Sequence, residues 1–155
     1  MSGYQIADEP APSTFARFAV NPVFPMLAAM LGGVWIAWPW FAFNSFAVGS
    51  PTRRAELVWL AAALVALPLL FSALILARAN GWLPQSAGPY AGLLLVVVKL
   101  AAVYAVVTMQ SRTIEIYQYY GGSLANGTWV LVAAFLITNR GLLDGLPVLL
   151  RVTLQ

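Results

Sequence analysis

Hydrophobic residues occur in long continuous runs along this chain, and short polar segments separate the runs. Three runs lie at residues 24–47, 56–77 and 89–110, and a fourth, with a shorter apolar centre, extends over residues 128–150. Each run is close to the roughly 20 residues that a helix needs to cross the hydrocarbon core of a bilayer. The runs do not alternate as the strands of a membrane barrel do. The pattern therefore predicts an all-α integral membrane protein, a bundle of four transmembrane helices.

Prolines within two of these runs predict bends. Pro39 lies in the first run and Pro68 in the second. Membrane helices tolerate such prolines because neighbouring helices supply partners for the freed backbone groups. We therefore expect kinked helices at these positions rather than helix ends.

The polar segments predict a tail and three connections. Residues 1–21 form a mobile polar tail in this interpretation, and residues 22–155 form the membrane domain. The first two connections are short. The third, residues 111–127, alternates apolar and polar positions and contains the glycine pair Gly121–Gly122. Because its tyrosines favour the headgroup layer, this segment is expected to lie along the membrane surface.

The arginines near the helix ends leave the orientation almost undecided. If the chain has four spans, three arginines near the helix ends fall on each side of the membrane. One arginine precedes the first span and two follow it, and cytoplasmic loops are rich in basic residues. This local difference favours a chain with both termini outside.

Composition agrees with a membrane protein and excludes several other classes. Of the 155 residues, 61% are hydrophobic and 8% are charged, whereas about a quarter of a soluble domain is charged. The chain has no cysteine and no histidine, which excludes disulfides, thiolate or imidazole metal ligands and imidazole bases. We therefore expect no metal, no cofactor and no enzymatic activity. The basic residues are scattered, so no nucleic-acid footprint is present.

Three charged residues fall inside the predicted spans. Lys99 lies near the middle of the third span, and Arg140 and Asp144 lie four residues apart in the fourth. A charge at such depth costs about 2.5–3.5 kcal/mol, so these residues are expected to pair or to serve in transport. Two arrangements remain open. The three side chains form one buried layer, or the fourth span ends near Thr138 and leaves a tail at the surface or on a partner.

Small residues and aromatic rings mark two further features. Small residues on the first span predict close packing of helices within the chain, or docking on another subunit; they are Ala28, Ala29, Gly32, Gly33 and Ala37. Aromatic residues near the span ends predict interfacial anchors; they are Trp35, Trp38, Trp40, Trp82, Tyr117, Tyr119 and Tyr120. A groove for a lipid or a quinone beside Pro39 is the alternative interpretation of the rings in the first span.

The first span and its end carry a pattern of small and polar residues, namely Gly32-Gly33, Asn44, Ala47, Gly49 and Pro51. The pattern resembles that of a family of small, functionally uncharacterised bacterial membrane proteins, in which a Gly-Gly-Pro-Leu-Ala-Gly-Gly helix ends in Asn-x-x-Ala-Leu-Gly-x-Pro. In this chain Val34 replaces the proline, and Ala37-Trp38 replaces the second glycine pair. Further matches over roughly residues 20–135 are Leu83-Pro84-Gln85-Ser86, Gln110 and Gly121–Gly122. The resemblance implies a four-helix fold in the bacterial cytoplasmic membrane and no particular activity.

Three functions fit these features. The favoured one is a non-catalytic accessory or structural subunit of a larger bacterial membrane complex, because the chain is small and its helices carry small-residue and aromatic faces. The first alternative is a small transporter or channel-like oligomer that uses the layer of Lys99, Arg140 and Asp144. The second is an immunity or regulatory membrane protein that binds a partner. The expected partners are the lipid bilayer and other membrane subunits or further copies of the chain.

Overall fold

A computed structural model describes residues 10–139 and 145–154 of the chain. Over this range the protein is helical, and its only β-type pairing is an isolated bridge between Val20 and Ala125. Two 3-10 turns, η1 (Ala16–Phe18) and η2 (Gln85–Ala87), accompany the helices. The α-helices are α1 (Val23–Leu31), α2 (Val34–Val48), α3 (Arg53–Ala79), α4 (Gly88–Tyr119), α5 (Thr128–Asn139) and α6 (Val148–Leu154).

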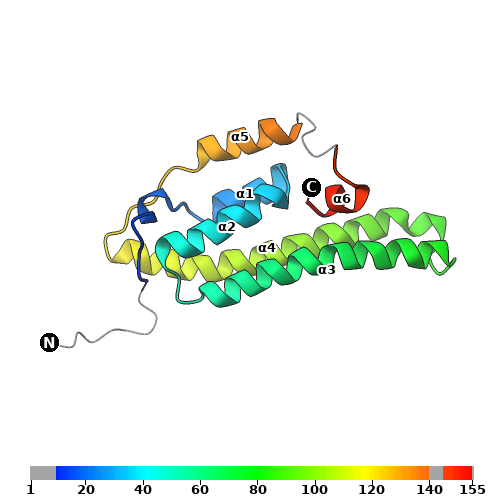
Figure 1. The fold of residues 1–155 in the computed structure, drawn as a ribbon, viewed down its shortest axis with the longest axis horizontal. Coiled ribbons are helices and arrows are strands. Elements are labelled where there is room, and N and C mark those ends of the chain that lie inside the picture. Colours follow the sequence, from blue (N-terminus) through cyan, green and yellow to red (C-terminus); the bar gives the residue numbers. More distant parts are fainter. Residues whose placement is uncertain (1–9, 140–144, 155) are drawn as a thin grey trace.

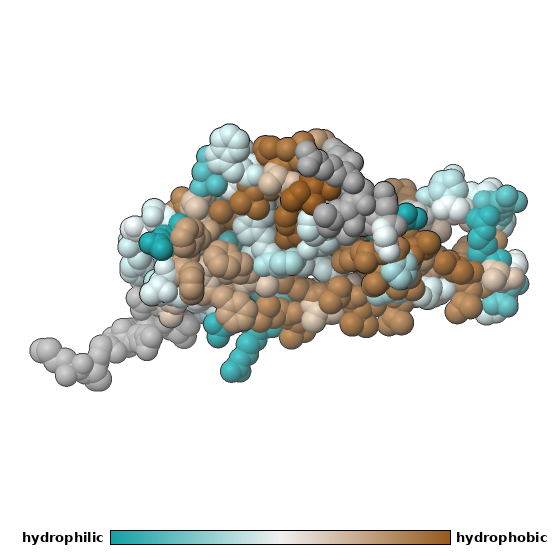
Figure 2. All heavy atoms as spheres, turned by 45° about the horizontal axis from the view of Figure 1, so that its top comes forward, coloured by the Kyte–Doolittle hydropathy of each residue, from teal (hydrophilic) through white to brown (hydrophobic). Residues whose placement is uncertain are grey.

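The long helices α3 and α4 form an antiparallel hairpin that runs the length of the molecule (Figure 1). With 27 and 32 residues, they are about 40 and 48 Å long at 1.5 Å per residue. Their most apolar parts have mean hydropathies of 2.6 and 2.3, and both helices are long and apolar enough to cross a membrane. Figure 2 shows hydrophobic surface along these helices, and hydrophilic residues gather at the end where α3 connects to α4. The runs at 56–77 and 89–110 are therefore helices, as expected.

The first apolar run forms two helices rather than one. The chain reverses at Gly32–Gly33, where Gly33 has a φ of 94°, a conformation open mainly to glycine. Helices α1 and α2 are antiparallel, so that Asn44 near the end of α2 lies beside Val20, just before α1 (Figure 1). The prediction of one helix over 24–47 is wrong, because the break falls at the glycine pair and α2 continues through Pro39.

Helix α4 is longer than its apolar run, since it continues to Tyr119. The expected end of this helix at residue 110 is therefore wrong, since residues 111–119 are helical. Gln110, Thr113, Ile114 and Tyr117 have the spacing of one helix face, and the first three are buried. The apparent alternation of this segment was helical periodicity over a short stretch. Gly121, with a φ of 85°, follows the end of the helix.

The fourth apolar run is not one helix over the described residues. Helix α5 ends at Asn139, residues 145–147 are not helical, and α6 begins at Val148, directly after Pro147. Helix α5 packs on α1, whereas α6 packs on α3 (Figure 1). The continuous span over 128–150 is therefore wrong, and the proline, which is favourable at a helix start, explains where the second helix begins.

The part of the predicted tail that is described is packed. The backbone N–H of Ala11 donates to the carbonyl of Gly49 at 3.2 Å, and the N–H of Ser13 donates to the carbonyl of Ala47 at 3.0 Å. Ala19 and Val20 are buried. Residues 10–20 thus form a strap over the end of α2, which corrects the expectation of a mobile tail for this segment.

Among the described helices, only α3 and α4 extend through the whole length of the fold. Along α3, the distance from Glu56 to Arg78 is about 33 Å, close to the thickness of a hydrocarbon core. From Ser45 to the start of α2 at Val34 is only about 16 Å. Helix α5, with 12 residues, is about 18 Å long. The α1–α2 hairpin and α5 therefore reach about half of the depth that α3 and α4 cover.

Candidate functional site

A cluster of polar side chains is buried where the α1–α2 hairpin meets the two long helices. We call it the Glu56 cluster. Its members come from α2, from the connection to α3 and from α3 and α4; they are Ser45, Ser50, Thr52, Glu56, Gln110 and Thr113. All except Thr52 are buried. Buried polar groups must be hydrogen-bonded to avoid a penalty of about 1–3 kcal/mol each, so the cluster is a strongly determined part of the fold.

The carboxyl group of Glu56 is at the centre of this cluster and has no exposed surface. Its Oε1 accepts hydrogen bonds from Ser50 Oγ at 2.5 Å and from Thr52 Oγ1 at 2.6 Å. Its Oε2 accepts from Ser45 Oγ and from Gln110 Nε2. Four donors fill the four acceptor sites that a carboxylate offers. The protein therefore replaces the water that this group loses on burial.

Gln110 connects α4 to α2 and to Glu56. Its Nε2 lies 2.7 Å from the carbonyl oxygen of Phe41, 2.9 Å from Ser45 Oγ and 2.9 Å from Glu56 Oε2. Its Oε1 is buried without a hydrogen-bond partner among the described residues. Because Phe41 precedes Ser45 by one helical turn, one amide side chain holds two successive turns of α2.

No basic side chain among residues 10–139 and 145–154 forms an ion pair with Glu56; within this range its partners are hydroxyl and amide groups. The carboxyl lies in the first turn of α3. The amino-terminal end of a helix carries a partial positive charge, which favours an acidic side chain at this position. Helix dipole and neutral donors together stabilise the group without a counterion. Physically, the arrangement joins three elements at one point.

Asn44 provides a second set of hydrogen bonds between α2 and the rest of the chain, beside the Glu56 cluster. Its Oδ1 accepts a hydrogen bond from the backbone N–H of Val20 at 3.2 Å, and its Nδ2 donates to the Val20 carbonyl at 2.9 Å. Asn44 is buried. The Asn44 side chain thus pairs with both backbone groups of Val20, as a neighbouring strand would.

The layer expected from Lys99, Arg140 and Asp144 lies partly outside the described residues, since Arg140 and Asp144 belong to the undescribed segment. Lys99 lies near the middle of α4 and lines a small cavity of about 110 Å³ together with Leu67 and Val152. No described carboxylate forms an ion pair with Lys99. The described residues therefore do not bring the three charges together.

The small residues of the first run pack inside the protein. Ala28, Ala29, Gly32, Gly33 and Ala37 are all buried. A Cβ placed on Gly32 would lie 3.3 Å from Thr138 Oγ1 of α5, which shows how closely that helix crosses the hairpin. Thr138 Oγ1 also donates to the Gly32 carbonyl at 2.9 Å. Glycine at this position therefore allows α5 to contact the end of α1.

The aromatic residues divide into two groups. Trp38 and Trp40 are buried in the core, and Trp35 donates its Nε1–H to the Gly32 carbonyl at the turn of the hairpin. These three rings are inside the fold instead of at the ends of a span. Trp35, Trp38 and Pro39 do line an apolar cavity of about 330 Å³, closed on the other side by α3 and α6. Trp82, Tyr119 and Tyr120 are exposed at the ends of the long helices, and Tyr117 is half-buried.

Sequence analysis did not identify Glu56 as a functional candidate. Its local signal was present, because Ser50-Pro51-Thr52 followed by an acid is typical of a helix start. The non-local signal was absent, since Gln110 is 54 residues away from Glu56.

Comparison of the chain with known protein families, curated proteins and solved structures finds no match.

Proposed function

We propose that the chain is a multi-pass protein of the bacterial cytoplasmic membrane that acts as a non-catalytic accessory or structural subunit of a larger membrane assembly. In this proposal four segments are embedded in the bilayer: α3 and α4 cross it, and the α1–α2 hairpin and α5 enter to about half depth. The two long apolar helices support insertion. The resemblance of the first-span pattern to small bacterial membrane proteins supports the compartment.

One observation carries the assembly role: apart from their contact with α6, the halves of α3 and α4 next to their connection at residues 80–87 are left uncovered by the described chain, and we call them the bare half. No residue of α3 beyond Leu67 is buried, and no residue of α4 before Val103 is buried. Large apolar side chains there are widely exposed; they include Leu69, Ile75, Leu76, Leu93 and Val97. Because lipid offers no hydrophobic drive for packing, a bare helix pair in a bilayer is a surface on which other helices can pack.

The arginines support a definite orientation for this arrangement. Because the α1–α2 hairpin begins and ends at the same end of the molecule, Arg17 lies at that end with Arg53, Arg54 and Arg112. Arg78 lies at the opposite end, in the last turn of α3. The excess of basic residues on the cytoplasmic side then orients the base of the hairpin toward the cytoplasm. This orientation replaces the expectation that both termini are outside.

Photocross-linking in living cells tests the assembly role. A photoreactive amino acid at Leu69 or at Val97, on the bare half, is expected to give one discrete adduct with another membrane protein. The matched control is Val58, which is equally apolar and 66% exposed but lies near the hairpin base; it is expected to give no such adduct. Adducts only with lipid at all three positions contradict the proposal. An adduct with a second copy of the chain supports a self-associating oligomer instead.

A further inference from the structure

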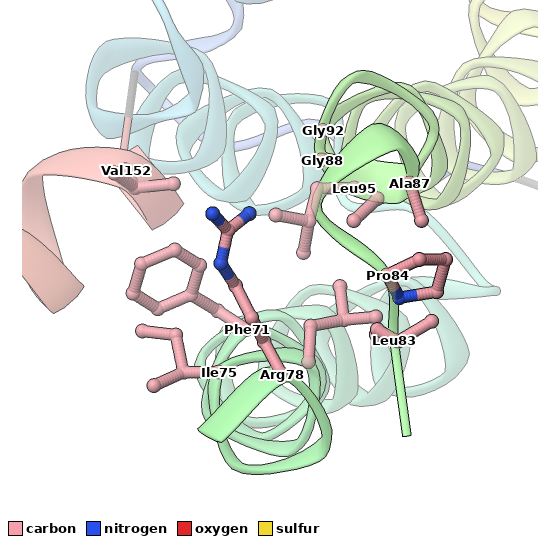
Figure 3. A pocket seen from close by; sticks show the side chains of 12 residues that line it. Phe71, Ile75, Arg78, Leu83, Pro84, Ala87, Gly88, Gly92, Leu95 and Val152 are labelled. Carbon is pink, nitrogen blue, oxygen red and sulfur yellow. The ribbon is translucent and has the colours of Figure 1, made fainter. Parts of the chain in front are cut away.

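A groove runs between the far ends of α3 and α4 and is closed on one side by α6 (Figure 3). It has a volume of about 260 Å³, just below the range of typical small-molecule sites. Eleven of its twelve lining residues are apolar side chains or glycines, and the twelfth is Arg78. The groove therefore combines an apolar wall with a single positive charge.

Arg78 extends into this groove rather than away from it (Figure 3). A Cβ placed on Gly88 would lie 3.3 Å from Arg78 Nη1, so the guanidinium lies against the start of α4. Among the described residues, its side chain has no hydrogen-bond or ion-pair partner, and no carboxylate lines the groove. A guanidinium recognises phosphate and carboxylate groups through its fork of donors, and this one is available.

The depth of the groove matches that of a lipid. Arg78 is in the last turn of α3, and Gly88 is the first residue of α4, so the guanidinium lies where the apolar helices end. From there the groove extends toward the middle of the helices, past Phe71 and Leu95. These residues lie about 10 Å further along their helices. Lipid phosphates occupy the same level as the helix ends, and acyl chains extend inward from it.

We propose that this groove binds an anionic phospholipid, with the phosphate on Arg78 and the first part of one acyl chain between α3, α4 and α6. The inference rests on the proposed membrane insertion of α3 and α4, but not on the proposed assembly role. An anionic lipid is the favoured occupant because Arg78 supplies one positive charge and the groove supplies no negative charge for a choline or ethanolamine group. The apolar wall requires an acyl chain and not free phosphate alone.

Native mass spectrometry of the full chain in detergent tests whether the charge of Arg78 selects anionic lipids. The probes are phosphatidylglycerol, phosphatidylcholine with the same chains, and glycerol 3-phosphate, which has the phosphate but no acyl chain. The wild type is expected to bind phosphatidylglycerol about tenfold more tightly than phosphatidylcholine, the effect of a charged hydrogen bond, and not to retain glycerol 3-phosphate. Arg78→Gln is expected to remove this preference. Arg54→Gln, which changes an exposed arginine at the other end of the same helix, is expected to keep it.

A second variant tests the apolar wall without touching the charge. Gly92 lines the groove, and a Cβ on this residue meets nothing within 4 Å. Gly92→Phe therefore places a ring at the groove from a position with room for its Cβ, and it replaces a poor helix former. It is expected to lower the binding of both lipids about tenfold, since the acyl chain loses its place. Lipid preference that survives Arg78→Gln, or lipid binding that survives Gly92→Phe, overturns the inference.

A second experiment on the same proteins measures membrane insertion. Membranes that contain the wild type or a variant are washed with alkaline carbonate, which removes peripheral proteins only. If the wild type leaves the membrane, the proposed insertion fails and the lipid site fails with it. If all variants stay in the membrane but lipid preference does not depend on Arg78, only the lipid site fails.

Discussion

Glu56 and its neighbours show how one buried carboxyl group can hold several helices together. The group is fully buried, and four donors from α2, α4 and the connection before α3 surround it. Without the carboxyl group these donors would lose their common acceptor and keep only their contacts with one another, with Thr113 and with the Phe41 carbonyl. The contact between the hairpin and the long helices is therefore centred on one side chain.

Replacing Glu56 by alanine is expected to lower the free energy of unfolding by about 2–4 kcal/mol. The loss arises because the buried hydroxyl and amide donors of the cluster lose the acceptor that they share. The measurement is SDS-induced unfolding of the purified protein in mixed micelles. Glu115→Ala is the control, since Glu115 is exposed on α4 and its change is expected to cost less than about 0.5 kcal/mol. Equal effects of the two substitutions would contradict the role given to Glu56.

Gly49 carries a second constraint at the residue scale. It has a φ of 67°, and a Cβ on it would overlap the carbonyl of Ala11 in the amino-terminal strap. Gly49→Ala is expected to cost at least about 2 kcal/mol more than Gly81→Ala. Gly81 has a similar φ of 75° but has open space around it, so only the backbone strain remains there. Thermal unfolding in detergent measures both variants, and similar losses in melting temperature would exclude the strap contact.

Single residues of the cluster were only partly predictable. Asn44, Gly49 and Gln110 were singled out in the sequence only through a resemblance of motifs, and Asn44 was expected near a helix end. Glu56 was interpreted only as the start of an apolar run. Its role depends on Ser45 and Gln110, and contacts across 54 residues leave no periodic trace in a sequence.

At the scale of elements, the reversal at Gly32–Gly33 determines the packing of the first half of the chain. Trp35 and Thr138 both donate to the Gly32 carbonyl, which the end of α1 leaves without a helical partner. Helix α5 therefore meets the hairpin at its turn, and the contact is made by side chains on both elements.

A pair of introduced cysteines tests this contact, and the chain has no cysteine of its own. Gly32→Cys with Thr138→Cys is expected to form a disulfide readily, because the Cβ on residue 32 would lie 3.3 Å from the present Oγ1 of Thr138. Gly32→Cys with Thr128→Cys is the control, since Thr128 is about 15 Å away along α5. The cross-link is detected as a shift on a non-reducing gel after mild oxidation. Failure of the first pair, or success of the second, would exclude the observed position of α5.

Elements were predictable where apolar length decided the outcome. Helices α3 and α4 follow from long apolar runs, and neither Pro68 nor Lys99 ends the helix in which it lies. The hairpin did not follow, because the glycine pair Gly32–Gly33 lies within an apolar run and is equally typical of close helix packing. The extension of α4 did not follow either, since the nine residues of mixed polarity at 111–119 fit a surface segment and a helix face alike.

At the scale of the whole molecule, the hairpin changes which parts of the chain share a side of the membrane. A cysteine at Phe15 and a cysteine at Ala55, both exposed positions, are expected to react with an impermeant maleimide from the same side. A cysteine at Ser86 is expected to react from the opposite side, because it lies in the connection between α3 and α4. If the first apolar run were one span, positions 15 and 55 would be on opposite sides.

Spheroplasts and lysed membranes provide the measurement for this prediction. Positions 15 and 55 are expected to be protected in intact spheroplasts and labelled after lysis, whereas position 86 is labelled in both. The whole-molecule topology was not predictable from the hydropathy alone, because four long runs imply four crossings. The correction came from Gly33 and from the contact between Asn44 and Val20, neither of which changes the hydropathy.

The contact between Gln110 and Phe41 has a consequence for biosynthesis. Gln110 follows Phe41 by 69 residues, so the hairpin base cannot close until α3 and almost all of α4 have been made. The hairpin base is therefore completed only after both long helices exist, whichever part of the chain folds first.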